Sequence, residues 1–144
     1  MSASVYPSTL FGSRSLQDAI TKLAAKHGLD LAAREAHLRL EQPSFMPLVI
    51  EKIGLHQVSV AHYYYQNGDA IPDPDIVLFT RYAIWVPIEI SIPYGYSRYG
   101  YLNERGDEIE RITSLYWQRD LASFCDTWAQ SIEIQGWLES GVRA

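Results

Sequence analysis

Residues 62–75 read HYYYQNGDAIPDPD and bring together the side chains of this chain that are best suited to metal or proton chemistry. One imidazole and three carboxylates fall within this short segment: His62, Asp69, Asp73 and Asp75. Converging carboxylates bind hard cations, and a histidine beside them widens the choice of metal. One interpretation is therefore a metal-dependent hydrolase or nuclease, which requires the four side chains to meet around one ion or water.

The same segment also has the composition of a tight turn. Asn67-Gly68 is the dipeptide that best tolerates positive φ at both central positions of a type I′ turn. Asp69 adjoins that turn, and Asp73 precedes Pro74, where aspartate commonly begins a turn. An EF-hand register fails, because a loop that begins at Asp69 places Ile71 third. We therefore expect a structural turn, with no metal and no cofactor, and keep the hydrolase as the alternative.

Other catalytic patterns have little support in the sequence. The four histidines show no HExxH or HxH spacing, and GxSxG, P-loop, GxGxxG and CxxC patterns are absent. The single cysteine, Cys125, falls on an apolar helical face, which is typical of a buried, inert thiol. His62 shares a strand face with Val58, Val60 and Tyr64, as hydrogen-bonded core or rim histidines do. We predict no catalytic residue and lean away from an enzyme.

A tyrosine-rich stretch between residues 94 and 101 is the main candidate for binding. It consists of Tyr94, Tyr96, Arg98, Tyr99 and Tyr101, and an acidic turn follows with Glu104, Asp107, Glu108 and Glu110. The tyrosines could anchor a protein interface, stack the bases of a single strand, or simply pack on a sheet. The carboxylates could resemble phosphates to a basic partner, although such charge runs are usually only solvated.

The composition favours one folded domain that binds proteins. A chain of 144 residues with 47% hydrophobic and 20% charged residues can bury a core as a single domain. Ten Tyr and four Trp favour an interface, whereas the net charge of −5 disfavours nucleic acid as a partner. Apolar runs stay well short of the roughly 20 residues of a membrane span. We predict a cytoplasmic protein with no membrane partner, and leave a homodimer open.

The N-terminal part is predicted to be an arm over residues 1–14 and a helix over about residues 16–27, at the start of a single domain that spans residues 15–144. Ser15 and Asp18 have capping-box spacing, and apolar residues follow at helical intervals until Gly28 provides a stop. Asp30 is expected to cap one more helical turn through LAAREA.

From His37 the apolar period changes to two, which predicts a sheet. Strands are predicted in HLRLE, PLVIEKI, QVSVAHYYYQ and, after a hairpin at Asn-Gly, DAIPDPDIVLFT. Two prolines place the start of the last segment at an edge or a bulge. A further strand, Ile84 to Ile92, is expected to turn one face to the core, with Val86, Ile88, Ile90 and Ile92 on that face and Glu89 and Ser91 opposite.

The C-terminal part is predicted to be a helix that begins at Ser114 and packs on the sheet. Its apolar stripe consists of Leu121, Phe124, Cys125, Trp128 and Ile132. Gly136 is the expected stop, with Trp137 folding back onto Ile132. The predicted fold class is α+β: a twisted antiparallel sheet of five or six strands with an N-terminal and a C-terminal helix on one face. The tyrosine-rich stretch is either another strand or an exposed loop.

Three segments resemble an uncharacterised bacterial domain family that is often carried on plasmids, integrative elements and phages. They are VSVAHYYYQNGDAIPDPDIVLF, the following Trp85-Val86-Pro87, and LASFCDTWAQSIEIQGW, within residues 46–138. The most specific piece is His62-Tyr63, Gln66-Asn67-Gly68-Asp69 and Asp73-Pro74. After Ile88 the sequence departs from the family, which tends to carry a polar Gln/Asn-Asp-x-x-Gly stretch there. The family lends no catalytic role to any residue.

The resemblance implies a mobile-element context, in which small acidic proteins often bind and block host machinery, including CRISPR complexes and restriction enzymes. We therefore predict a non-enzymatic protein-binding domain, encoded by a mobile element or phage, that inhibits a bacterial defence complex in the manner of an anti-CRISPR protein. The predicted contact surface is the 94–101 stretch with the acidic turn. A single-stranded nucleic-acid binder that uses Tyr94 to Tyr101 is a further alternative.

Overall fold

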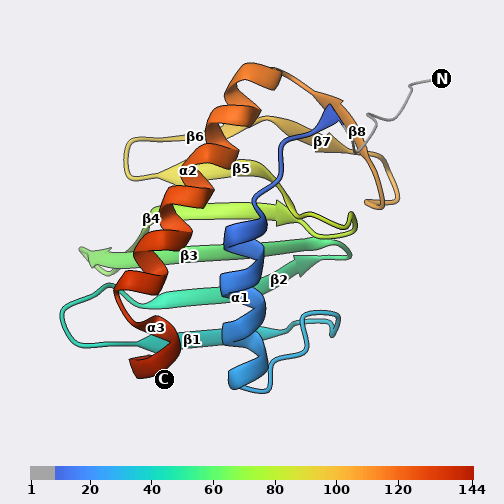
Figure 1. The fold of residues 1–144 in the computed structure, drawn as a ribbon. Helices are drawn as coiled ribbons and strands as arrows, with labels where there is room; N and C mark the ends of the chain where they lie inside the picture. The colour runs from blue at the N-terminus through green and yellow to red at the C-terminus, as the bar shows by residue number, and fades with distance from the viewer. Residues whose placement is uncertain (1–8) are drawn as a thin grey trace.

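The computed structural model describes residues 9–144 and confirms the α+β class (Figure 1). Its helices are α1 (Arg14–Lys26), α2 (Leu115–Ile134) and α3 (Trp137–Ser140). Its strands are β1 (His37–Glu41), β2 (Leu48–Gly54), β3 (Gln57–Gln66), β4 (Asp69–Phe79), β5 (Val86–Ile92), β6 (Gly95–Arg98), β7 (Gly100–Leu102), β8 (Ile109–Ile112) and β9 (Val142–Arg143). Seven of these strands form one antiparallel sheet in the order β6-β5-β4-β3-β2-β1-β9, and the helices cross one face of it.

Helix α1 begins slightly earlier than its capping box predicted. Ser13, not Ser15, is the N-cap, and its side chain accepts a hydrogen bond from Leu16 N. The predicted arm of residues 1–14 falls mostly on residues 1–8, which lie outside the described residues. Its described end is attached to the domain, because Ser13 is buried and donates from its backbone N–H to Trp85 O. Gly28 has a φ of 69° and ends the helix as predicted.

The segment after α1 is a turn, and the meander that follows matches its sequence pattern. Asp30 accepts a hydrogen bond from Ala32 N at 2.9 Å, but the turn does not continue into a helix. The β3-β4 hairpin turns at Asn67 and Gly68, whose φ angles of 53° and 84° are both positive, as a type I′ turn requires. The register of this hairpin shifts between the Ala61 and Tyr63 pairs, which places the two prolines of β4 beside a bulge.

Strand β5 does not keep one apolar face. Val77 pairs with Glu89 but Leu78 pairs with Pro87, so one extra residue, Ile88, bulges from β5. Beyond the bulge the alternation is reversed. Val86 and Ile88 pack in a cluster on the helix-free face, whereas Ile90 packs against the core under the helices. The prediction that Val86, Ile88, Ile90 and Ile92 share one face is therefore wrong, because a bulge cannot be read from alternation alone.

The tyrosine-rich stretch forms strands instead of a loop. β6 pairs with β5 at the edge of the main sheet, while β7 and β8 form a separate two-stranded ladder. A second apolar cluster joins this ladder to the sheet, with buried Val77, Phe79, Val86, Ile88 and Ile109. The predicted count of five or six strands is too low, because β6 and the two-residue β9 extend the sheet at its two ends.

Helix α2 begins after Ser114, which accepts a hydrogen bond from Trp117 N, and covers the sheet as predicted. One member of its predicted stripe is wrong: Phe124 is 42% exposed, and Gln118 and Ala122 are buried in the helix instead. Gln118 is satisfied because its side chain hydrogen-bonds both the N–H and the C=O of Phe11. A polar residue with backbone partners can therefore occupy a core position.

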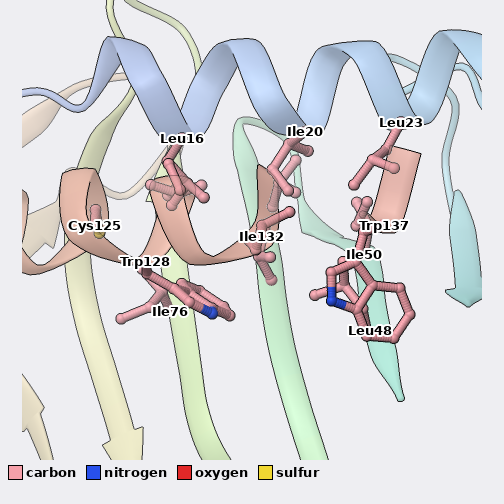
Figure 2. Close-up of a cluster of buried hydrophobic side chains, with 14 of the residues drawn as sticks. Leu16, Ile20, Leu23, Leu48, Ile50, Ile76, Cys125, Trp128, Ile132 and Trp137 are labelled. Carbon is pink, nitrogen blue, oxygen red and sulfur yellow. The ribbon is translucent and has the colours of Figure 1, made fainter. Parts of the chain in front are cut away.

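The main core lies between the two long helices and the sheet. Figure 2 shows Leu16, Ile20 and Leu23 of α1 above Trp128 and Ile132 of α2, with the strand side chains below. Gly136 has a φ of 73° and ends α2, and Trp137, which is fully buried, belongs to the same core as Ile132. Among residues 9–144, none of the helices has the length and hydropathy needed to cross a membrane.

Candidate functional site

The end of the sheet at β6 exposes more aromatic surface than a packed strand does. The β5-β6 hairpin turns at Pro93 and Tyr94, because Ile92 pairs with Gly95, and Tyr94 is 96% exposed. Tyr96, in the middle of β6, is 59% exposed. The two N-terminal tyrosines of the predicted binding stretch therefore lie on the surface of the edge strand.

A groove of about 330 Å³ runs between β6 and α2, and we call it the edge groove. Its lining includes Ile92, Tyr96, Tyr99, Trp117, Leu121 and Phe124. Ile92 and Gly95 pair on the helix-facing side of the sheet, so the small glycine leaves the groove open beside the strand. In the described part of the chain, Asp120 is the charged residue that lines this groove. The groove is thus mainly apolar and aromatic, with one carboxylate.

The exposed apolar surface continues from the groove along the first turns of α2. Trp117 is half-exposed, Tyr116 is more so, and their rings meet edge to face with centroids 4.9 Å apart. Phe124 follows two turns later on the same helix, with its ring tilted against Trp128 at 6.4 Å. Aromatic side chains held by neighbouring rings lose little conformational entropy when a partner covers them, which suits them to binding.

The helix-free side of β6 is polar. Tyr96 donates its hydroxyl hydrogen bond to Glu89, and burial together with this bond raises the pKa of Tyr96 to about 12. The phenol therefore remains a neutral donor at physiological pH. Arg98, opposite Glu89 in the register, donates from Nε to Gly100 O at 3.0 Å. The bond to Glu89 holds the Tyr96 side chain on the face opposite the edge groove, so Tyr96 borders the groove with its main chain.

The two C-terminal tyrosines of the stretch have structural contacts. Tyr99 is half-buried and packs against the main core. Two guanidinium groups lie over the ring of Tyr101, with Arg98 at 4.6 Å and Arg111 at 4.2 Å from its centroid. Cation–π stacking of this kind occupies ring surface that a nucleic-acid base would need. The predicted stretch thus divides into an exposed half and a packed half.

The acidic turn is ordered by its own contacts. It connects β7 to β8 and so belongs to the two-stranded ladder and not to the sheet that contains β6. Asn103 donates to Asp107 Oδ1 at 2.7 Å and accepts from Asp107 N at 3.0 Å. The hydrogen bond from Asn103 is the main cause that lowers the pKa of Asp107. Arg105 approaches Asp107 at 3.5 Å, and Arg81 approaches Glu108 at 3.8 Å. Arginines thus offset part of the predicted negative surface, whose other members are Glu104 and Glu110.

The histidine of the proposed metal cluster lies in the core. His62 pairs with Leu48 and therefore points to the helix-covered face, where its ring contacts Trp128 and Trp137 at centroid distances of 5.6 and 5.8 Å. Its Nδ1 lies 3.1 Å from Pro47 O and 3.2 Å from Met46 O, so the neutral ring donates from this nitrogen. Burial lowers the pKa of His62.

The aspartates of that cluster do not gather around His62, although Asp73 lies near enough for its charge to act on the imidazole. Asp75 alternates with the core residue Ile76 and therefore points to the helix-free face, where it accepts hydrogen bonds from Ser59 Oγ at 2.5 Å and Tyr63 OH at 3.1 Å. Asp69 is exposed beside the hairpin turn, and Asp73 is half-exposed at the bulge. The structure therefore does not bring the four side chains together. Within residues 9–144, no group of three or more acidic, histidine or cysteine side chains is placed to hold a metal.

Cys125 has the environment of a structural thiol. It is fully buried in the main core, and burial raises its pKa well above the ordinary value (Figure 2). Because the thiolate is the reactive form, a raised pKa keeps this cysteine unreactive at neutral pH.

Sequence reasoning missed the helix half of the edge groove. Phe124 falls at a core position of the apolar stripe. A helical pattern does not indicate that the sheet fails to extend under this position of the helix. Tyr116 and Trp117, by contrast, carried a signal. They are consecutive aromatic residues at the start of the helix, so at least one of them must point away from the core. Exposed aromatics next to a capping serine could have identified this side of the site.

The comparisons with known proteins give a family and no activity. A family model described as "Domain of unknown function (DUF6908)" matches residues 18–138. No curated protein and no solved structure shows a significant match to the chain. The matched residues include the β5-β6 hairpin and the whole of α2, and therefore the edge groove.

Proposed function

This chain belongs to the DUF6908 family, and from that premise we propose that it is a protein-binding domain whose contact surface is the edge groove. The observation that supports the proposal is the exposure of large apolar side chains around one groove at one end of the sheet. Ile92, Trp117 and Phe124 line the groove itself, Tyr116 lies against Trp117, and Tyr94 is exposed at the adjoining hairpin turn. Solvent-exposed aromatics grouped beside a depression are the common anchors of protein interfaces.

The chemistry of the groove suits a protein partner better than a small charged substrate. Most of its lining is apolar or aromatic, and the Asp120 carboxylate provides a charged group at its margin. Protein interfaces commonly have an apolar centre that the partner buries and a polar rim around it. The host-defence complex and the mobile element stay predictions that rest on the family resemblance, and the cytoplasmic location stays a prediction from the sequence.

The proposal is tested by exchanging one anchor in the groove for alanine and comparing it with a matched site on the same helix. Phe124→Ala removes a ring from the groove, whereas Ile134→Ala removes an 85% exposed side chain at the far end of α2. Each variant and the wild type are immobilised, incubated with bacterial lysate and analysed by quantitative mass spectrometry. We expect a set of proteins that the wild type and Ile134→Ala retain and that Phe124→Ala loses by about tenfold or more, as for a central anchor.

Equal retention by all three proteins, or retention no better than that of bare resin, contradicts the proposed function. Thermal unfolding of each variant is the control, because Phe124 also contacts Trp128. A loss of binding counts only where the variant keeps a cooperative transition above the assay temperature.

A further inference from the structure

Strand β6 is one of the two edges of the seven-stranded sheet, and within residues 9–144 no other strand pairs with its outer side. Tyr99 N donates to Ile88 O at 2.7 Å, and hydrogen-bonded pairs alternate along an antiparallel ladder. The backbone groups of Ser97 and Gly95 therefore point to β5. Those of Tyr96 and Arg98 point outward. Thr113 lies beside the end of this edge: its Oγ1 is 3.5 Å from both Arg98 O and Tyr99 O, and its N–H donates to Tyr99 O at 2.9 Å. The outward groups of Tyr96 lie beyond this contact.

Among residues 9–144, the protection of this edge is limited to the short length of β6, four residues, and to Arg98 at its end. Native edge strands are commonly blocked by proline, an inward-pointing charge or a covering loop. β6 has the sequence GYSR, and its helix-facing positions are Gly95 and Ser97, both small. An extended chain laid beside β6 would pair with the outward groups of Tyr96. Because side chains of a strand alternate, every second side chain of that chain would enter the edge groove.

We propose that the edge groove binds an extended peptide segment of the partner protein, which adds to the sheet as a strand beside β6. The segment has apolar side chains at alternate positions and a lysine or arginine that reaches Asp120. This inference rests on the proposed function and specifies the ligand class and the binding mode of the same groove. Strand addition to an exposed sheet edge is an established mode of peptide recognition, in which main-chain bonds give affinity and alternate pockets give specificity.

The charge of the groove selects a basic peptide. Asp120 is exposed at the groove and takes part in none of the ion pairs of the described residues. The whole chain has a net charge of −5, so its field attracts a basic segment and repels an acidic one. On the helix-free side, Glu89 adds a second carboxylate near the same strand, held by Tyr96.

The probe is a displayed library of random twelve-residue peptides selected against the full chain, from which the most enriched peptide is synthesised. We expect enriched peptides with alternating apolar residues and at least one lysine or arginine. Tyr96→Pro removes the outward N–H that the peptide needs, and the preceding Gly95 has no Cβ to clash with the proline ring. Tyr96→Ala is the matched control, because it removes the same side chain but keeps the N–H.

We expect Tyr96→Pro to weaken binding of the peptide by about tenfold or more and Tyr96→Ala to leave it within about threefold, in fluorescence anisotropy. Asp120→Lys is expected to weaken binding by a similar factor, and Glu133→Lys, an exposed acid elsewhere on α2, is not. A second measurement avoids any change to the protein. The same peptide with N-methyl groups at alternate positions should lose binding in one of the two methylation registers, because only one edge of a strand faces β6.

The outcomes separate this inference from the proposed function. If Phe124→Ala weakens peptide binding but Tyr96→Pro and both methylated peptides do not, the groove binds protein without strand addition and the inference is wrong. Equal losses from Tyr96→Pro and Tyr96→Ala, or a library with no enrichment, also overturn it. A concentration-dependent dimer that Tyr96→Pro dissociates would assign the edge to a second copy of the chain. Insensitivity to both Phe124→Ala and Tyr96→Pro would remove the proposed function as well.

Discussion

The contact between the β7-β8 ladder and the main sheet predicts the effect of adding a single methyl group. Gly100, the first residue of β7, is buried, and a Cβ placed on it would lie 2.5 Å from Ile88 Cγ2 and 2.9 Å from Ile88 Cβ. Both distances are below van der Waals contact, and Ile88 is itself fully buried in the bulge of β5. The ladder must therefore shift or Ile88 must leave its position.

Overpacking of this kind typically costs about 1–3 kcal/mol. We expect Gly100→Ala to lower the free energy of unfolding by that amount, measured by urea denaturation followed by tryptophan fluorescence. Gly95→Ala is the matched control, because Gly95 is also a strand residue and a Cβ there meets no atom within 4 Å. That substitution should be neutral or stabilise the fold by up to about 1 kcal/mol, since alanine loses less backbone entropy than glycine.

A double-mutant cycle isolates the contact. Ile88→Ala alone should cost about 2–5 kcal/mol, because it empties a buried position. In that background Gly100→Ala has room for its methyl group and should cost close to nothing, which gives a coupling of about 1–3 kcal/mol. Equal stabilities for Gly100→Ala and Gly95→Ala, or the same cost of Gly100→Ala with and without Ile88, would refute the placement of β7 over the β5 bulge.

Two further predictions concern His62 and the start of α1. Burial lowers the pKa of folded His62 below the value of about 6.5 in the unfolded chain, so the unfolded state binds more protons between these values. The wild type should therefore lose stability as the pH falls below about 6.5. The difference in unfolding free energy between wild type and His62→Gln should depend on pH in that range and be constant at higher pH. A difference that is constant at every pH would show that the pKa of His62 is the same in the folded and unfolded states. Ser13→Ala should cost about 1–2 kcal/mol in urea denaturation, because it removes the helix cap and a 2.6 Å hydrogen bond to Asp126. Ser15→Ala, at the cap position predicted from the sequence, removes only an exposed 2.7 Å hydrogen bond to the same carboxylate and should cost less, about 0.5 kcal/mol. The reverse order of the two costs would show that the helix begins later.

The elements of the fold follow from local sequence signals, because each depends on neighbouring residues. A type I′ turn requires positive φ at two successive positions, and Asn67-Gly68 is the dipeptide that best tolerates both. Gly136 followed by an apolar tryptophan likewise predicted the end of α2 and the return of Trp137 to the core. In such places, backbone sterics and side-chain hydrophobicity indicate the same conformation, so the sequence alone is sufficient.

The candidate site depended on features that no single segment contains. Strict alternation placed Val86 and Ile90 on one face, but the bulge at Ile88 separates them. The helical stripe placed Phe124 in the core, but the sheet ends at β6 and leaves that position over the groove. His62 and Asp75 are close in sequence yet lie on opposite faces of the sheet, because each follows the apolar pattern of its own strand. Register, bulges and sheet width are tertiary properties, and they determine which residues lie together at the candidate site.

The central claim is that the groove between β6 and α2 is where this domain meets its partner. Hydrogen–deuterium exchange of the chain, free and saturated with a protein retained by the wild type, measures this most directly. We predict slower exchange on binding in residues 92–98 and in the part of α2 around Trp117 to Phe124, with little change over the β3-β4 hairpin. Protection confined to the acidic turn at residues 104–110, or to the helix-free face around Tyr63 and Asp75, would contradict it.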